Sequence, residues 1–247
     1  MSNENNGWET YSKLVLQQLE TMASGIESLR TELQDVKGQL TELKAREDRV
    51  SDLKSWKEKL ISLVNVTKKS YVLDLASGSG DLTKLLKDKV DCNCLIFDSN
   101  LEMLKNAKKK IKNAQIISGK AENLPFKDES FDYVIVGFGL RNFSDIDQSL
   151  RETWRVLKKN GNFLCLEFSE INNFFIRKLF YLYGKIIPKY AGVFLNRKIA
   201  YDYLIESIKQ FPNQVELSGK LKRNKYSNIE VIDIIDGLAS IHIAQKK

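Results

Sequence analysis

The chain has 247 residues, 43% of them hydrophobic and 10% aromatic, which is enough to build one α/β domain and an additional segment. Its net charge of +7 would suit an anionic partner, but the lysines between Lys105 and Lys112 are interleaved with few arginines or aromatic residues, so we expect no nucleic-acid binding. No apolar run reaches the roughly 18–20 residues of a membrane-spanning helix, no secretory signal is found, and three cysteines without a C-x-x-C pair argue against zinc or disulfides, so we expect a cytoplasmic protein without a metal.

The N-terminal segment has the heptad pattern of a coiled coil. Apolar residues alternate in steps of four and three between Val15 and Val50. One series is Leu19, Ile26, Leu33 and Leu40, and the other is Val15, Met22, Leu29, Val36, Leu43 and Val50. Glu32 and Lys37 flank these series and could pair between parallel chains. We expect residues 1–55 to join copies of the chain into a homo-oligomer, or else to fold back on their own domain.

After Trp56 the pattern changes to alternating strands and helices. We expect strands at 71–76, 94–98, 114–118, 132–138, 162–168, 229–235 and 238–244. We expect helices at 52–64, 81–89, 100–112 and 145–158, with more helix between 172 and 210. Such repeats predict a parallel sheet with helices on both faces, and Asp236-Gly237 predicts a hairpin that makes one terminal strand antiparallel. The predicted fold is the Rossmann-like seven-stranded sheet of class I methyltransferases, in residues 56–247.

Residues 72–82 (VLDLASGSGDL) run from a buried strand into a glycine loop. Gly78 and Gly80 can adopt backbone angles closed to other residues and let a ligand approach the main chain. Asp81 follows directly, and a carboxylate there disfavours a phosphate, which requires a positive field at a helix N-terminus. A ligand with an ammonium and a sulfonium would suit it. The loop therefore indicates S-adenosyl-L-methionine.

Two further acids accompany this loop. Asp98 ends the next strand, 18 residues after Gly80, where an acid in a doubly wound sheet hydrogen-bonds ribose hydroxyls. The alternative is that Asp98 caps the helix that starts near Asn100. Asp74, inside the first strand, either contributes to the cofactor site or braces the loop by accepting backbone N–H bonds.

From about Trp56 to its C-terminus the chain resembles the UbiE-type C-methyltransferases of ubiquinone and menaquinone biosynthesis. The segments that carry the resemblance are residues 72–83, Asp98 with 103–104, 121–126 (AENLPF), 130–133 (SFDY), 138–142 (FGLRN), 155–158 (RVLK), 161–169 and 203–208 (YLIESI). The resemblance implies S-adenosylmethionine-dependent C-methylation of a polyprenyl quinol ring, either demethylmenaquinol or 2-methoxy-6-polyprenyl-1,4-benzoquinol. The family's N-terminal Tyr-Asp…Met-Asn signature, which folds over the cofactor, is absent, and the coiled coil occupies its place.

The resemblance also implies particular cofactor contacts. They are Ser79, Asp98, Lys120, Ala121 and Gly137. Asp74 of the first strand and Gly78 and Gly80 of the glycine loop complete the predicted cofactor site. The five residues that the resemblance implies lie at carboxyl ends of parallel strands, where open α/β sheets bind ligands.

Arg141 and Asn142 follow the fourth strand, at the mouth where a substrate would meet the cofactor. We expect both to be catalytic, with Arg141 stabilising the developing quinolate or ordering a water that removes a proton. The alternative is that Arg141 only pairs with Asp145 or Asp147. His242, the one histidine, lies in an apolar strand, where a structural role is favoured.

An aromatic insertion at about 172–212 is expected to form a substrate lid, with Tyr201 and Tyr203 as substrate-binding residues. Its aromatic residues suit an isoprenoid quinol, and Lys178, Lys185 and Lys189 would suit an anionic bilayer surface, so we expect contact with the periphery of the inner membrane. Alternatively, the aromatic residues form the core of the lid itself.

Two other functions remain open at this point. The chain could methylate a different small molecule, or it could be a non-catalytic coiled-coil scaffold that carries a degenerate methyltransferase domain. The absent N-terminal signature favours the scaffold, whereas the intact glycine loop, Asp98 and residues 141–142 oppose it.

Overall fold

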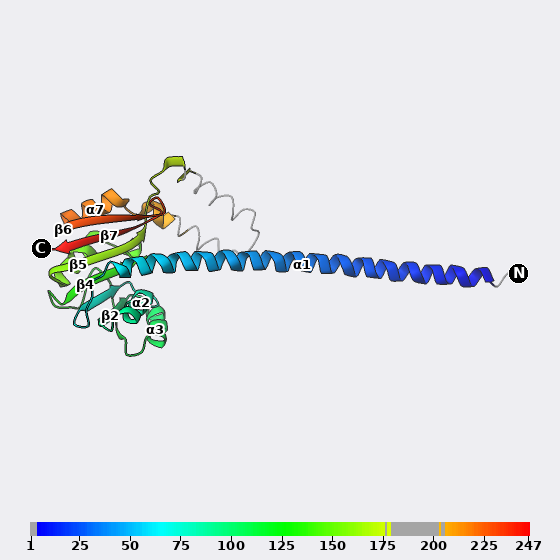
Figure 1. The fold of residues 1–247 in the computed structure, drawn as a ribbon, viewed down its shortest axis with the longest axis horizontal. Coiled ribbons are helices and arrows are strands. Elements are labelled where there is room, and N and C mark those ends of the chain that lie inside the picture. The colour runs from blue at the N-terminus through cyan, green and yellow to red at the C-terminus, as the bar shows by residue number, and fades with distance from the viewer. Residues whose placement is uncertain (1–3, 176, 179–202, 204–205) are drawn as a thin grey trace. The chain divides into compact units, whose positions relative to one another are not determined.

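The computed structural model describes residues 4–175, 177–178, 203 and 206–247, and the chain divides into two units, Met1–Lys54 and Ser55–Lys247. Helix α1 (Glu4–Ser62) forms the first unit and the beginning of the second (Figure 1). The expected helix at 52–64 is thus the end of one long helix, which no proline interrupts. Within it, the apolar residues between Leu16 and Val36 are 56–69% exposed in the single chain. Their association with another chain stays a prediction.

The second unit is built on a seven-stranded sheet with the order β3-β2-β1-β4-β5-β7-β6 (Figure 1). The strands are β1 (Tyr71–Leu75), β2 (Asn93–Asp98), β3 (Gln115–Ser118), β4 (Phe131–Gly137), β5 (Leu157–Phe168), β6 (Tyr226–Ile234) and β7 (Ala239–Lys246). Strands β1 to β5 pair in parallel, and β7 is antiparallel to both β5 and β6. The predicted fold class is confirmed.

The β6–β7 hairpin turns at the predicted Asp236-Gly237. Both residues have positive φ (53° and 89°), as the primed turns of hairpins require, and the Leu238 N–H donates to the Ile235 carbonyl at 3.0 Å. This turn reverses the chain so that β7 lies between β5 and β6.

The helices of the second unit are α2 (Asp81–Lys89), α3 (Leu101–Lys110), the 3-10 turn η1 (Leu140–Asn142), α4 (Ile146–Val156) and α7 (Gln214–Arg223). The helices predicted at 81–89, 100–112 and 145–158 are present, but α4 ends at Val156 because β5 already begins at Leu157, and neither η1 nor α7 was predicted. Asn213 and Glu216 form a capping box at the start of α7. Most of the expected lid, including Tyr201, Lys185 and Lys189, lies outside the described residues.

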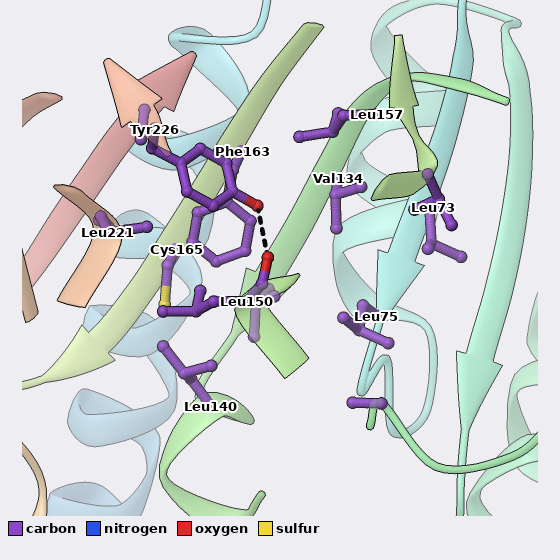
Figure 2. Close-up of a cluster of buried hydrophobic side chains, with 14 of the residues drawn as sticks. Leu73, Leu75, Val134, Leu140, Leu150, Leu157, Phe163, Cys165, Leu221 and Tyr226 are labelled. Carbon is purple, nitrogen blue, oxygen red and sulfur yellow. Dashed lines mark hydrogen bonds between the residues drawn. The ribbon is translucent and has the colours of Figure 1, made fainter. Parts of the chain in front are cut away.

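A continuous hydrophobic core fixes this architecture (Figure 2). Phe163 of β5 packs against Tyr226 of β6 with ring centroids 5.6 Å apart, and the Tyr226 hydroxyl is 2.8 Å from that of Thr153 in α4. His242 is buried in β7, where its Nε2 lies 3.1 Å from the Gln214 carbonyl oxygen, and burial lowers its pKa. These contacts support its structural role. No helix among the described residues is both long and apolar enough to cross a membrane.

Candidate cofactor and substrate site

A cavity of about 540 Å³ opens at the carboxyl ends of β1 to β4. Its volume falls in the range of roughly 300–1,000 Å³ that is typical of small-molecule sites. The cavity lies where the chain crosses from one side of β1 to the other, which is the position at which open α/β sheets bind ligands. Seven of the predicted site residues line it together, namely Gly78, Ser79, Asp98, Lys120, Ala121, Gly137 and Asn142.

Three residues of the glycine loop have left-handed backbone angles: Ala76, with φ +54°, and the two glycines. Gly78 has φ +53° and Gly80 has φ +75°, a region that side-chain-bearing residues rarely occupy. A Cβ on Gly80 would also lie 2.8 Å from Cδ1 of Ile111. Gly78 lines the cavity, whereas Gly80 packs against α3 and sets the start of α2. At the end of β4, a Cβ on Gly137 would lie 2.8 Å from Cδ1 of Leu82.

Asp74 lies behind the loop and outside the cavity. Its Oδ2 accepts hydrogen bonds from the Thr83 N–H at 3.0 Å and the Thr83 hydroxyl at 2.7 Å, while Oδ1 has no partner among the described residues. Burial raises its pKa to about 7 against the opposing effect of the Thr83 hydrogen bonds. Asp74 therefore has a bracing position and not one in contact with the cofactor cavity. The hydrogen-bond donors that it braces belong to Thr83 of α2 and not to the glycine loop.

Asp98 ties the glycine loop to β2. Its Oδ2 accepts the Gly78 N–H and its Oδ1 accepts the Asn100 N–H, both at 2.8 Å. Asn100 itself caps α3 by accepting the N–H groups of Glu102 and Met103, so Asp98 is not the helix cap. Because each carboxylate oxygen can accept more than one hydrogen bond, Asp98 retains acceptor capacity toward the cavity that it lines.

Asp81, the acid that follows the loop, is paired with two lysines. Asp81 accepts a hydrogen bond from the Lys57 ammonium at 2.7 Å and pairs with the Lys110 ammonium on its other oxygen. Burial would raise its pKa, but these two lysines outweigh burial and lower the pKa to about 2. The three charges sum to +1. The sequence did not show this, because Lys57 arrives from α1 and Lys110 from α3.

Arg141 is held by an ion pair that sequence reasoning missed. Its Nη1 donates to Glu167 Oε1 at 2.5 Å and to the Phe138 carbonyl at 2.9 Å. The expected alternative partners are wrong, because Asp145 caps α4 and Asp147 pairs with Lys220 at 2.5 Å. The guanidinium is not among the groups that line the cavity. The sequence feature that could have pointed to this ion pair is Glu167 itself, because it is an acid within the apolar strand segment LCLEF.

Asn142, the next residue, lines the cavity. Its Oδ1 accepts a hydrogen bond from the Tyr203 hydroxyl at 3.1 Å, which brings one of the two predicted substrate residues to the site. Phe138 also lines the cavity, with φ +58°, and its ring lies 6.3 Å from that of Trp56. Sequence reasoning did not select Phe138 or Lys57 as site residues.

Comparison with known proteins identifies the family of the chain. The model of the ubiE/COQ5 methyltransferase family matches residues 49–246. The Ubiquinone/menaquinone biosynthesis C-methyltransferase UbiE of Rickettsia prowazekii (strain Madrid E) is 39% identical over 203 residues, which cover 77% of this chain and 82% of that protein. The protein of the same name from Rickettsia felis is 41% identical over 189 residues, covering 72% and 76%.

Solved structures share the fold at low identity. A methyltransferase from Haloferax volcanii, in complex with the Trm112 methyltransferase activator, has a TM-score of 0.60 at 18% identity and covers 81% of this chain and 92% of its own. Phosphoethanolamine N-methyltransferase 2 from Haemonchus contortus, in complex with S-adenosyl-L-methionine, has a TM-score of 0.55 at 14% identity, covering 73% and 49%. The chain belongs to the ubiE/COQ5 methyltransferase family and is an S-adenosylmethionine-dependent methyltransferase.

Proposed function

We propose that the chain transfers the methyl group of S-adenosylmethionine to a ring carbon of a polyprenyl quinol. The observation that carries the proposal is the cavity at the carboxyl ends of β1 to β4, where the glycine loop, Asp98 and Asn142 meet. The curated relatives, which bear the name of a quinone-biosynthesis C-methyltransferase, support the choice of acceptor. The intact cavity opposes the reading as a non-catalytic scaffold.

The cavity residues fit the parts of the cofactor. Asp98 would accept the ribose hydroxyls, Lys120 and Ala121 would contact the adenine, and Gly137 would lie at the end of β4 beside the reacting methyl group. Lys57 would bind the carboxylate of the methionine end, because the cluster that it forms with Asp81 and Lys110 carries a net positive charge.

The cofactor supplies an electrophilic methyl group, and the protein must hold the acceptor carbon about 3 Å from it, in line and without water. Asn142 is the cavity-facing polar group nearest in sequence to the β4 end, and we assign it to the hydroxyl of the quinol ring, together with Tyr203. The predicted substrate role of Tyr201, which lies outside the described residues, stays a prediction from the sequence. Deprotonation of the ring hydroxyl raises the nucleophilicity of the ring carbon.

A polyprenyl acceptor requires access to a bilayer, so we place the enzyme in the cytoplasm at the periphery of the inner membrane. The described beginning of the proposed lid supports this placement. Phe174 and Phe175 are 60% and 79% exposed, and Arg177 and Lys178 follow one residue later in the sequence. Exposed aromatic residues beside cations are typical of interfacial segments. We further propose that the heptad stripe of α1 joins the enzyme into a homo-oligomer.

Quinone profiling tests the function. The chain is expressed in a bacterial strain that lacks its own quinol C-methyltransferase. The quinones are then extracted, and their molecular masses are measured by mass spectrometry. We expect the demethylated quinone to disappear and the methylated product, heavier by one CH₂, to return. Continued accumulation of the demethylated quinone, despite soluble expression of the chain, would contradict the proposed acceptor.

A further inference from the structure

A buried carboxylate, Glu167, organises the turn that brings Asn142 to the cavity. Glu167 is 1% exposed near the end of β5, and its carboxylate accepts three hydrogen bonds. Oε1 accepts the Arg141 guanidinium at 2.5 Å and the Phe168 N–H at 3.0 Å, and Oε2 accepts the Arg141 N–H at 3.3 Å. The carboxylate thus joins β5 to both the backbone and the side chain of η1.

The Arg141 side chain is largely buried and makes its contacts within the protein. Its side chain is 12% exposed, and its guanidinium carbon lies 5.4 Å from the centre of the Phe168 ring. The same Nη1 that meets Glu167 also donates to the Phe138 carbonyl at 2.9 Å. The guanidinium does not line the cavity, so direct contact with a quinolate would require it to move away from Glu167. Such a movement would leave a buried carboxylate without its counter-charge, which is strongly unfavourable.

Phe138, whose carbonyl accepts a hydrogen bond from Arg141, has a strained backbone. Phe138 has φ +58°, a genuine outlier for a bulky side chain. Its N–H donates to the Leu166 carbonyl at 2.8 Å, and its carbonyl accepts from Arg141, so both main-chain polar groups of Phe138 are hydrogen-bonded. The next residue, Gly139, has no space for a Cβ, which would lie 2.5 Å from Cβ of Ala76.

We propose that Glu167 and Arg141 are a positioning pair, which holds the left-handed Phe138 and the following turn so that Asn142 and the Phe138 ring face the methyl acceptor. The pair acts through these two cavity residues and does not touch the reacting atoms. This inference rests on the proposed function for the identity of the acceptor, but the pairing itself does not depend on it.

Steady-state kinetics on four proteins test the inference: wild type, Glu167→Gln, Arg141→Gln and the double variant, which leaves no unpaired buried charge. Misplacement of reacting groups by about 1 Å costs on the order of 100-fold in rate. We therefore expect kcat to fall roughly 10- to 100-fold in each single variant while the Kd for S-adenosylmethionine stays within about threefold. The double variant should be no slower than the slower single variant, because both changes break one unit.

Three results would overturn the positioning role. They are additive losses in the double variant, a near-normal kcat in Glu167→Gln, or a lowered melting temperature with unchanged kcat. Asp147→Asn, which breaks the ion pair with Lys220 of α7 and removes a side chain that does not line the cavity, is the matched control and should leave kcat unchanged.

A second readout separates this inference from the proposed acceptor. Amide nuclear magnetic resonance of Glu167→Gln should shift or broaden the signals of Phe138, Gly139 and Asn142 and leave those of Gly78 and Asp98 in place. Unmoved signals at 138–142 would refute the pairing role even if quinol is methylated. Shifted signals with a wild type that does not methylate quinol would retain the pairing and refute the acceptor alone.

Discussion

Asp74 shows how a buried carboxylate can shape a binding loop at the expense of stability. It holds Thr83 in the first turn of α2, and it is 1% exposed. Burial raises its pKa from 3.8 to about 7, so the folded state retains a proton that the unfolded state loses between these pH values. Stability therefore falls as the pH rises from about 4 to 7, and the full cost of about 4 kcal/mol is present above pH 7.

Asp74→Asn removes this ionisation and should raise the free energy of unfolding at pH 8, by up to about 4 kcal/mol less the cost of an unpartnered amide. The gain should shrink as the pH falls toward 4, where both states of the wild type are protonated. Denaturant melts at pH 8 and pH 4.5 measure the difference. Asp88→Asn, at an exposed site on α2, is the control. Equal effects of Asp74→Asn at the two pH values would contradict the assignment.

Variants of Lys57 and Lys110 can be compared to test which lysine binds the carboxylate of the cofactor. Both pair with Asp81, but Lys57 lines the cavity and Lys110 does not. Lys57→Met should raise the Kd for S-adenosylmethionine about tenfold, equivalent to about 1.4 kcal/mol, whereas Lys110→Met should change it less than threefold.

Calorimetric titrations with decarboxylated S-adenosylmethionine complete this test, because that compound lacks the group that Lys57 would contact. Its affinity should be the same for wild type and Lys57→Met. An equal loss of affinity for both compounds would show that Lys57 acts on the cavity shape instead.

At the scale of elements, helix α1 carries the sharpest unresolved prediction. The flanking positions that follow its second core series are basic at Arg30, Lys37 and Lys44. An antiparallel coil would set these positions against one another, whereas a parallel coil sets Lys37 opposite Glu32. We therefore expect parallel chains in register.

Single cysteine variants test this arrangement. In a parallel coil, both Leu19→Cys and Leu33→Cys should form disulfide-linked species under mild oxidation, since each core residue meets its own copy. Leu33→Glu should dissociate the oligomer in sedimentation experiments, while Gln34→Glu, one residue away on the helix, should not. A monomeric wild type, or cross-linking at only one of the two cysteine positions, would contradict the proposal.

The elements that could be predicted are those whose signals are local. Strand periodicity and the Asp236-Gly237 turn fix the sheet, and strand ends carry most of the cavity residues. Helix α7 was not predicted, although Asn213 and Glu216 have the spacing of a capping box, which marks the start of a helix. The Arg141 partner could not be found in this way, because Glu167 is 26 residues away and reaches η1 only through the pairing of β4 with β5.

At the scale of the whole molecule, two regions of different periodicity share one chain. The unit Ser55–Lys247 contains the complete cavity, including Lys57 at the end of α1. The family match begins at residue 49 and so leaves most of the heptad segment outside it. All the residues that line the described cavity, from Lys57 to Ser144, lie within the family match.

Calorimetric titration of S-adenosylmethionine into the purified full-length chain tests the central claim most directly. We predict one site per chain with a Kd in the micromolar range, and a Kd at least tenfold higher for Asp98→Ala, which removes the acceptor for the ribose hydroxyls. The absence of binding heat at high micromolar ligand, or an unchanged Kd in a folded Asp98→Ala variant, would contradict the account of the cavity.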